Sequence, residues 1–280
     1  MKEHSLSERK ACCMIKMSRT VFNYRQDTEK DAKGIEELNR LAGRHPGYGF
    51  GKMKDRLKLE GFCWNHKKIY RVYTELKMNL RRKHKRRLPT RQAISISIPS
   101  HAHHTWSMDF MTDTLYGGRQ VRILNIIDDY NRQALAQQVD FSLPAKRVIH
   151  LLEHLTSVHG KPLCIRTDNG PEFISHTLMN WCHKNKIQMH FIQPGKPMQN
   201  GLIERFNGSY RKEILDAYVF YSLQELQMIT QLWMEEYNNY RPHESLNGQT
   251  PIQYALQNNL TNNKSNNSNI NQITNFELAL

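Results

Sequence analysis

Three carboxylates that lie far apart in the sequence have the residue type and the setting for metal-dependent chemistry. Asp109 lies inside an extended run, Asp168 lies where an apolar run gives way to a turn, and Glu204 lies near the start of an amphipathic helix at residues 199–211. Carboxylate oxygens are the ligands that Mg²⁺ and Mn²⁺ prefer. Two such ions about 3.5–4 Å apart can hold the attacking and leaving oxygens of an in-line phosphoryl transfer. The three acids therefore predict a site for Mg²⁺ or Mn²⁺, with two ions expected, provided that the fold brings them together.

The elements that must position these acids are predicted from the alternation of apolar runs and turn residues between residues 104 and 217. Gly117 and Gly118 mark one turn and residues 129–131 another, so the first three strands should form an antiparallel meander. Pro144 suits the first turn of a helix. The expected order is strand 104–112, strand 120–128, strand 132–140, helix 144–160, strand 163–167, helix 175–185, strand 187–192 and the helix that carries Glu204.

This order of elements indicates an α/β, ribonuclease-H-like fold, in which a five-stranded mixed sheet is flanked by helices. In that fold the middle of the first strand lies beside the end of the fourth, and the last helix packs across the same edge. Asp109, Asp168 and Glu204 are therefore expected to converge. Arg211 follows Glu204 by seven residues, which places it two turns further along the same helical face.

The basic charge of the chain is concentrated in its first third. The 280 residues include 40 Lys and Arg and 26 Asp and Glu, which gives a net charge of +14. Residues 1–91 alone contain 25 Lys and Arg and 10 Asp and Glu, which gives a net charge of +15. A segregated basic region of this size is typical of a nucleic-acid-binding module. A charge that served solubility alone would be spread more evenly.

Short helices are predicted within this basic region, which suggests a small all-α, helix-turn-helix DNA-binding part. Two lie within residues 5–25, a pattern equally compatible with an ordinary helical hairpin. Another spans residues 52–60, and Asn65 is then placed to cap a helix with an apolar face and a basic face. Its basic face and the following basic run supply the predicted DNA-binding residues Lys67, Lys68, Arg71, Arg81, Arg82 and Lys83.

The sequence divides into five expected regions. They are an N-terminal helical region at 1–45, a basic DNA-binding region and linker at 46–91, a catalytic core at 100–220, a helical extension of the core at 221–256, and an Asn-rich tail at 257–280 that is expected to be disordered.

Several motifs around the acids resemble one known family. They are Asp-Asn-Gly-Pro-Glu-Phe at 168–173, Pro-Gly-Lys-Pro-Met-Gln-Asn-Gly at 194–201, Ile-Glu-Arg-Phe-Asn-Gly at 203–208, and Tyr-Asn-x-x-Arg-Pro-His-x-Ser-Leu at 237–246. Together with Asp109, Asp168 and Glu204, which resemble the DDE triad shared with retroviral integrases, they resemble the OrfB-type transposases of the IS-three family of bacterial insertion sequences. The resemblance extends over residues 44–254, but the chain begins without the upstream OrfA-type helix-turn-helix and leucine zipper of the fused form.

The resemblance implies an enzyme that cleaves and joins DNA strands at the ends of its element, dependent on Mg²⁺ or Mn²⁺ held by the three acids. It implies terminal inverted repeats and target DNA as partners, a homo-multimer on DNA and an upstream OrfA-type protein or fusion. Arg211 would meet DNA phosphate. Polar residues near the acids either contact DNA or serve turns and caps; they are Asn169, Lys196, Gln199, Asn200 and Asn207.

The same residues leave two alternative functions open. The chain could be a metal nuclease that cleaves without joining, or a non-catalytic DNA-binding regulator of the element. Other carboxylates near the site (Asp113, Asp128, Asp129 and Glu172) are expected to be structural, and the His150-x-x-Glu153-His154 pattern lacks an acid to complete a zinc site. The chain has no signal-like segment, no apolar run of roughly 20 residues and only scattered cysteines, which predicts a cytoplasmic protein that is independent of membranes. The resemblance to bacterial transposases implies that it is a bacterial, nucleoid-associated protein.

Overall fold

The computed structural model describes residues 7–23, 31–80, 99–193 and 197–258. The chain divides into two compact units, the first made mainly by residues 1–81 and the second mainly by residues 82–280. The predicted DNA-binding residues Arg81, Arg82, Lys83 and Lys196 lie outside the described residues, as do nearly all of the Asn-rich tail and most of the basic linker.

The first unit begins with the two short helices that the sequence predicts. Helix α1 spans Glu8–Met14 and helix α2 spans Arg19–Phe22. Each begins at a serine whose hydroxyl accepts a hydrogen bond from a backbone N–H of the first turn, Ser7 from Lys10 and Ser18 from Val21.

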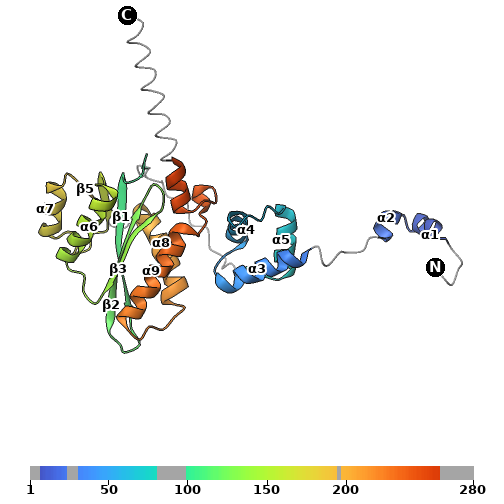
Figure 1. Ribbon diagram of the computed structural model, residues 1–280, viewed down its shortest axis with the longest axis horizontal. Coiled ribbons are helices and arrows are strands. Elements are labelled where there is room, and N and C mark those ends of the chain that lie inside the picture. Colours follow the sequence, from blue (N-terminus) through green and yellow to red (C-terminus); the bar gives the residue numbers. More distant parts are fainter. Residues whose placement is uncertain (1–6, 24–30, 81–98, 194–196, 259–280) are drawn as a thin grey trace, which may run out of the picture. The chain divides into compact units, whose positions relative to one another are not determined.

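Three further helices form the body of the first unit (Figure 1). They are α3 at Ala32–Arg44, α4 at Phe50–Leu59 and α5 at His66–Glu75. Helix α3 was not identified from the sequence, although its buried Leu38 and Leu41 have helical spacing. Gly61 ends α4 with a φ of 89°. As predicted, Asn65 caps α5 by accepting a hydrogen bond from the backbone N–H of Lys67.

The second unit contains one five-stranded mixed sheet, with strands in the order β3-β2-β1-β4-β5. Strands β1, β2 and β3 form the predicted antiparallel meander, and β4 and β5 add in parallel to β1. The bounds are Thr105–Thr114, Gln120–Asp128, Ala134–Asp140, Cys164–Thr167 and Gln188–Phe191 for β1 to β5. This strand order and direction confirm the ribonuclease-H-like fold class.

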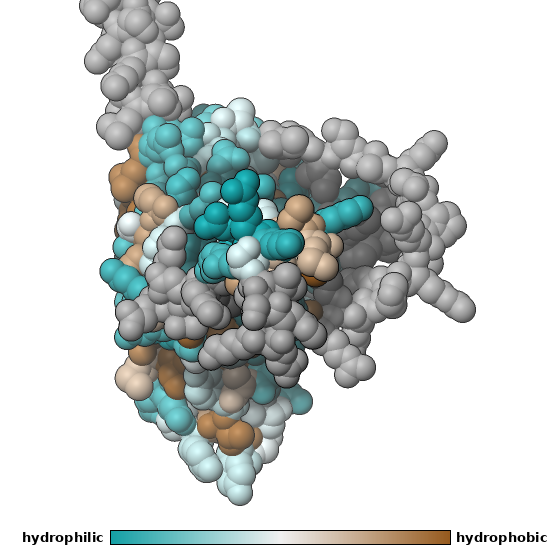
Figure 2. All heavy atoms as spheres, turned by 90° about the vertical axis from the view of Figure 1, so that its right-hand side faces the viewer, coloured by the Kyte–Doolittle hydropathy of each residue, from teal (hydrophilic) through white to brown (hydrophobic). Residues whose placement is uncertain are grey.

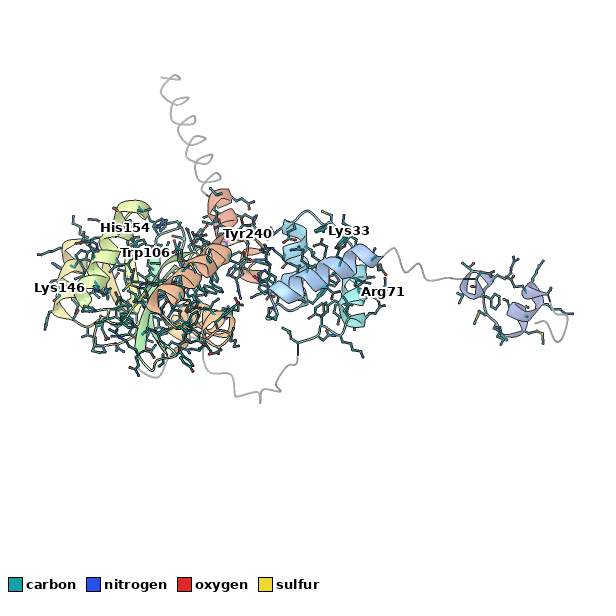
Figure 3. The ribbon with its side chains drawn as sticks, turned by 60° about the horizontal axis from the view of Figure 1, so that its bottom comes forward. Lys33, Arg71, Trp106, Lys146, His154 and Tyr240 are labelled. Carbon is teal, nitrogen blue, oxygen red and sulfur yellow. The ribbon has the colours of Figure 1, made fainter. Side chains whose placement is uncertain are left out.

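Helices cover both faces of this sheet (Figure 1). Helices α6 (Ala145–His159) and α7 (His176–Lys184) share one apolar cluster with the sheet, which includes Trp106 of β1 (labelled in Figure 3). Helices α8 (Gly201–Tyr210) and α9 (Leu223–Asn239) share the other. Each large apolar side chain buried in these clusters contributes about 1.5–3 kcal/mol by leaving water.

Helix α8 does not stop at its last α-helical residue. It continues as a π-helical turn at Arg211–Leu215, in which the N–H of Asp216 bonds to the carbonyl of Arg211 at 2.7 Å. π-Helical turns are rare and occur often beside functional sites. Pro197–Asn200 forms a 3-10 turn before α8 and Glu244–Leu246 forms another after α9.

Residues of the motif at 237–246 make hydrogen bonds and an ion pair that connect the end of α9 to the rest of the core. The side chain of Asn238 donates to the carbonyl and accepts from the N–H of Ala134, at 2.9 and 2.8 Å, at the start of β3. Arg241 makes a two-point ion pair with Glu213 of the π-helical turn, at 2.6 and 2.9 Å. Trp233 of α9 donates to the same carboxylate at 2.9 Å. The contacts of these motif residues are therefore structural.

No helix within the described ranges is both long enough and apolar enough to cross a membrane. On the face drawn in Figure 2, hydrophilic and hydrophobic residues are interspersed and form no continuous apolar band.

Candidate active site

The pairing of β1 with β4 brings the first two acids to neighbouring positions. Ser107 of β1 pairs with Arg166 of β4 in the parallel register. Two residues further along each strand lie Asp109, in the middle of β1, and Asp168, just after the end of β4. Neighbouring parallel strands keep such positions close together, and the charge of Asp168 acts on Asp109.

Glu204 reaches the same region from the helix layer. It lies in the first turn of α8, which packs against β1 and β2, and its side chain is exposed. Asp109 therefore lies on β1, Asp168 just after β4, and Glu204 on the helix that packs against β1. Their joint role as metal ligands stays a prediction.

The pKa of Asp109 is affected by the other two acids. Burial raises the pKa of Asp109 to about 6, and the charge of Asp168 adds to the increase. The hydrogen bond from the N–H of Phe110 lowers the pKa of Asp109, the charge of Glu204 raises it, and the hydrogen bond from the amide of Asn207 lowers it. The described residues nevertheless contain no group of three His, Cys, Asp or Glu drawn together as a ready metal site. The acids interact through their charges but do not form a closed cage.

Both oxygens of Asp109 have protein hydrogen-bond partners. Oδ1 accepts from the backbone N–H of Phe110 at 2.9 Å, and Oδ2 accepts from the side-chain amide of Asn207 at 2.7 Å. A carboxylate offers about four lone-pair positions, so each oxygen keeps capacity for another partner. Asn207 is three residues after Glu204 on α8, and it is buried.

The loop that carries Asp168 is closely fitted around its carboxylate. Oδ1 of Asp168 accepts from the N–H of Gly170 at 3.0 Å. A Cβ added at Gly170 would lie 3.0 Å from that same oxygen and 3.5 Å from Phe173, which is fully buried. The amide of Asn169 donates to the carbonyl of Ile192 at 3.0 Å, which joins the loop to the end of β5.

The other polar residues predicted near the acids have mixed surroundings. Gln199 accepts from the N–H of Gln193 at 2.8 Å, which is turn chemistry. Asn200 is buried at the start of α8, and its Oδ1 has no hydrogen-bond partner within the described residues. Arg211 donates to the carbonyl of Thr112 on β1 at 2.8 Å, and its side chain is 39% exposed.

The predicted basic face of α5 is partly paired with acids of its own unit. Lys68 and Arg71 both approach Asp31, at 3.2 and 2.6 Å, and Arg71 also pairs with Glu75 at 3.0 Å. Lys67 lies on the same helix and is exposed. Figure 3 labels Arg71 on this helix.

The competing carboxylates have structural partners, as expected. Asp128 accepts from two backbone N–H groups, Asp129 pairs with Arg166 at 2.6 Å, and Glu172 pairs with Arg122. Asp113 accepts from the N–H of Thr114 at 2.8 Å. Glu153, the acid of the zinc-protease-like pattern on α6, accepts from the indole N–H of Trp181 at 3.2 Å.

Two side chains beside Asp109 were missed by sequence reasoning. Asn125 of β2 donates to Asn207 at 2.7 Å, and Gln137 of β3 donates to Asn125 at 3.0 Å. Asn125 is a polar residue within the apolar run Ile123 to Ile127, which is a signal that the sequence offers. Its partners depend on the register of β2 with β3 and on the packing of α8, which the sequence does not reveal.

Comparison with known sequences shows which protein family the chain resembles. Two family models, both described as integrase core domain, match residues 99–197 and 185–251. An uncharacterized 31.7 kDa protein of insertion element IS407 from Burkholderia multivorans is 34% identical over 92% of this chain and 93% of its own length. An uncharacterized 39.2 kDa protein of insertion element IS476 from Xanthomonas euvesicatoria is 35% identical over 91% of this chain and 74% of its own length.

More distant similarities extend to a putative transposase and to viral integrases. The putative transposase InsK of insertion sequence IS150 from Escherichia coli is 24% identical over 82% of this chain and 83% of its own length. The HTLV-2 integrase catalytic core domain aligns at a TM-score of 0.43 and 20% identity, covering 56% of this chain and 98% of that one. From the matches to insertion-element proteins and to the integrase core, we conclude that the chain belongs to the insertion-sequence transposases and is an enzyme of the DDE polynucleotidyl transferase class.

Proposed function

We propose that this transposase cleaves and joins DNA strands at the ends of its insertion sequence in a reaction that depends on Mg²⁺ or Mn²⁺. The observation that carries the proposal is that the charges of both Asp168 and Glu204 act on Asp109, which lies on β1 beside β4, the strand that Asp168 follows. Carboxylates whose charges repel one another in this way are stabilised by a cation between them.

The donor set fits a hard divalent cation. All three groups offer carboxylate oxygen. The pKa of Asp109 is raised first by burial and then by the charges of Asp168 and Glu204, and a bound cation would offset both effects. Asp109, Asp168 and Glu204 would hold one or two ions. When bound, such ions supply Lewis-acid activation of the attacking oxygen and charge stabilisation of the leaving oxygen.

The proposed reaction has two steps of the same kind. In the first, water forms a bond to phosphorus at the element end, the bond to the 3′ oxygen breaks, and that oxygen takes a proton to become a hydroxyl. In the second, the oxygen of this 3′-hydroxyl gives up its proton and forms a bond to phosphorus of a target phosphodiester. The bond from that phosphorus to the target 3′ oxygen breaks, and the leaving oxygen takes up a proton to become a hydroxyl. The contribution of the chain is to align the reacting oxygens in line and to hold the acids in place.

DNA recognition is assigned to the basic N-terminal region and to residues near the acids. Residues 1–91 have a net charge of +15, which supports binding to phosphate. Lys67 and Arg71 on α5 are exposed, and Lys68 and Arg71 would exchange Asp31 for phosphate. The terminal repeats and target DNA are the proposed partners, and a homo-multimer would hold two ends together.

A strand-transfer assay with labelled oligonucleotides of the element ends tests this function. With Mg²⁺, we expect the full chain to nick the end and to form joined product, and we expect Asp109→Asn and Glu204→Gln to lose both while still binding the ends. Nicking without joined product would favour a metal nuclease. Unchanged activity of Asp109→Asn would refute the proposed site, and end binding with neither reaction in the wild type would favour a regulator.

A further inference from the structure

Three polar side chains form a row across the centre of the sheet. Asp109 of β1 pairs in register with Asn125 of β2, and Asn125 pairs in register with Gln137 of β3. Residues that lie opposite one another on neighbouring strands point to the same face of the sheet. Here that face is the one covered by α8, and Asn207 of α8 lies over the row.

Hydrogen bonds connect this row in a single direction. Gln137 donates to Asn125 at 3.0 Å, Asn125 donates to Asn207 at 2.7 Å, and Asn207 donates to Oδ2 of Asp109 at 2.7 Å. Asn125 is completely buried, and Ile123 and Ile127 on either side of it belong to the apolar cluster beneath α8 and α9. A buried amide in such surroundings is costly unless it is hydrogen-bonded.

The ionised carboxylate of Asp109 explains the direction of the chain of bonds. An ionised carboxylate only accepts hydrogen bonds, so Asn207 must turn its NH₂ group toward it. The oxygen of Asn207 then faces Asn125, which must donate, and the oxygen of Asn125 faces Gln137, which must donate in turn. The Oε1 atom of Gln137 ends the chain and has no hydrogen-bond partner within the described residues.

We propose that Gln137, Asn125 and Asn207 form a positioning relay that fixes Asp109 in the orientation required of a metal ligand. The inference rests on the proposed function, because it assumes that Asp109 binds the ion. The relay also ties α8 to β1 through Asn207, one turn after Glu204, and so sets the separation of Glu204 from Asp109. Hydrogen bonds to metal-ligating carboxylates have such a role in metal sites generally.

Leucine substitutions separate this role from a purely structural one. Gln137→Leu removes the outer member, and the double substitution Asn125→Leu with Gln137→Leu replaces both paired amides by apolar groups of similar size. Replacing both partners of the bond between Gln137 and Asn125 is nearly neutral for the fold, but the double variant also leaves Oδ1 of the buried Asn207 without its donor, which lowers stability. Without Asn125, only Asp109 holds the amide of Asn207, so neither side chain is fixed in orientation by the rest of the sheet.

Gln138→Leu is the matched control. It changes the same residue type on the same strand, but Gln138 points to the opposite face and lines a hollow beside Arg147 and His150 of α6. Both glutamines are partly buried. Any general effect of leucine on β3 should therefore be the same in the two variants.

The first measurement is the affinity of the full chain for Mn²⁺ in the absence of DNA, by calorimetry or by the electron paramagnetic resonance signal of free Mn²⁺. The second is the thermal unfolding temperature of each variant in the absence of metal. We expect Mn²⁺ affinity to fall about 10–100-fold in the double variant, to fall less in Gln137→Leu, and to stay unchanged in Gln138→Leu. The Mn²⁺ concentration for half-maximal strand joining should rise in parallel. The metal-free unfolding temperature should fall in the double variant and should stay close to that of Gln138→Leu in Gln137→Leu.

Two results would overturn the relay. The first is Mn²⁺ affinity in both relay variants equal to that of Gln138→Leu. The second is a lower unfolding temperature in the double variant with no change of affinity in Gln137→Leu, which would make the amides structural only. Asp109→Asn distinguishes the two proposals: if it keeps wild-type Mn²⁺ binding and joining, the proposed function fails, whereas if it loses both and the relay variants lose neither, only the relay fails.

Discussion

Gly170 provides a test of how precisely Asp168 is held. A Cβ at this position would lie 3.0 Å from Oδ1 of Asp168, which is tighter than ordinary van der Waals contact, and 3.5 Å from Phe173. Phe173 is fully buried and stacks on Phe110 with ring centroids 5.0 Å apart, so it has little room to move. In Gly170→Ala the carboxylate of Asp168 should therefore move by a few tenths of an ångström and weaken its 3.0 Å bond to the N–H of residue 170.

The expected effects on stability and on activity differ in size. Weakening that hydrogen bond costs up to about 1 kcal/mol. Gly170 does not have a positive φ, so the alanine also stabilises by about 0.4–1 kcal/mol through the unfolded chain. The free energy of unfolding should hardly change. A displacement of about 1 Å can cost about 100-fold in rate, so a shift of a few tenths should lower strand joining about tenfold.

Gly117→Ala is the control for this prediction. Gly117 lies in the turn between β1 and β2, has no positive φ, and its added Cβ would meet nothing within 4 Å. Joining rates and urea unfolding curves of both variants supply the comparison. If Gly170→Ala joins strands as fast as Gly117→Ala, the fitted loop does not position Asp168 and the reasoning is wrong.

Two further predictions concern ion pairs of the core. Arg241→Ala removes a buried cation that binds the carboxylate of Glu213 at two points. Urea unfolding should show a loss of about 3 kcal/mol, and a loss below about 0.5 kcal/mol would contradict it. The hydrogen bond from Arg122 holds the pKa of Glu172 below its ordinary value. This pair therefore stabilises the fold at pH values above the ordinary pKa of a glutamate, and the stabilisation is lost as the pH falls through the lowered pKa. Arg122→Gln should cost up to about 1 kcal/mol at neutral pH and little in acid, and an equal loss at all pH values in an unfolding series would argue against it.

The sequence was sufficient for the order of elements in the core. Glycine turns and the spacing of apolar residues both depend on local chemistry, and the strands and helices of the core lie within a few residues of their expected bounds. At the start of α9, Ser222 accepts a hydrogen bond from the N–H of Glu225, and the carboxylate of Glu225 accepts one from the N–H of Tyr221. Helix α3 was missed because no separate start or end was recognised in residues 26–45.

The relay beside Asp109 could not be predicted in the same way. Asn125 and Gln137 are 12 residues apart, and Asn207 is 82 residues from Asn125, so their contacts depend on strand register and on the packing of α8. Similarly, the sequence could not reveal that Lys68 and Arg71 are paired with Asp31, 40 residues from Arg71. Local patterns identified the acids, whereas tertiary contacts determine how they are held.

The most direct test of the central claim is anomalous diffraction at the manganese edge from crystals of the full chain soaked with Mn²⁺. The account predicts one or two manganese peaks within ligand distance, about 2.0–2.4 Å, of carboxylate oxygens of Asp109, Asp168 and Glu204. It also predicts that Asp109 keeps its hydrogen bond from Asn207. Manganese bound elsewhere in the chain with these three acids vacant would contradict it.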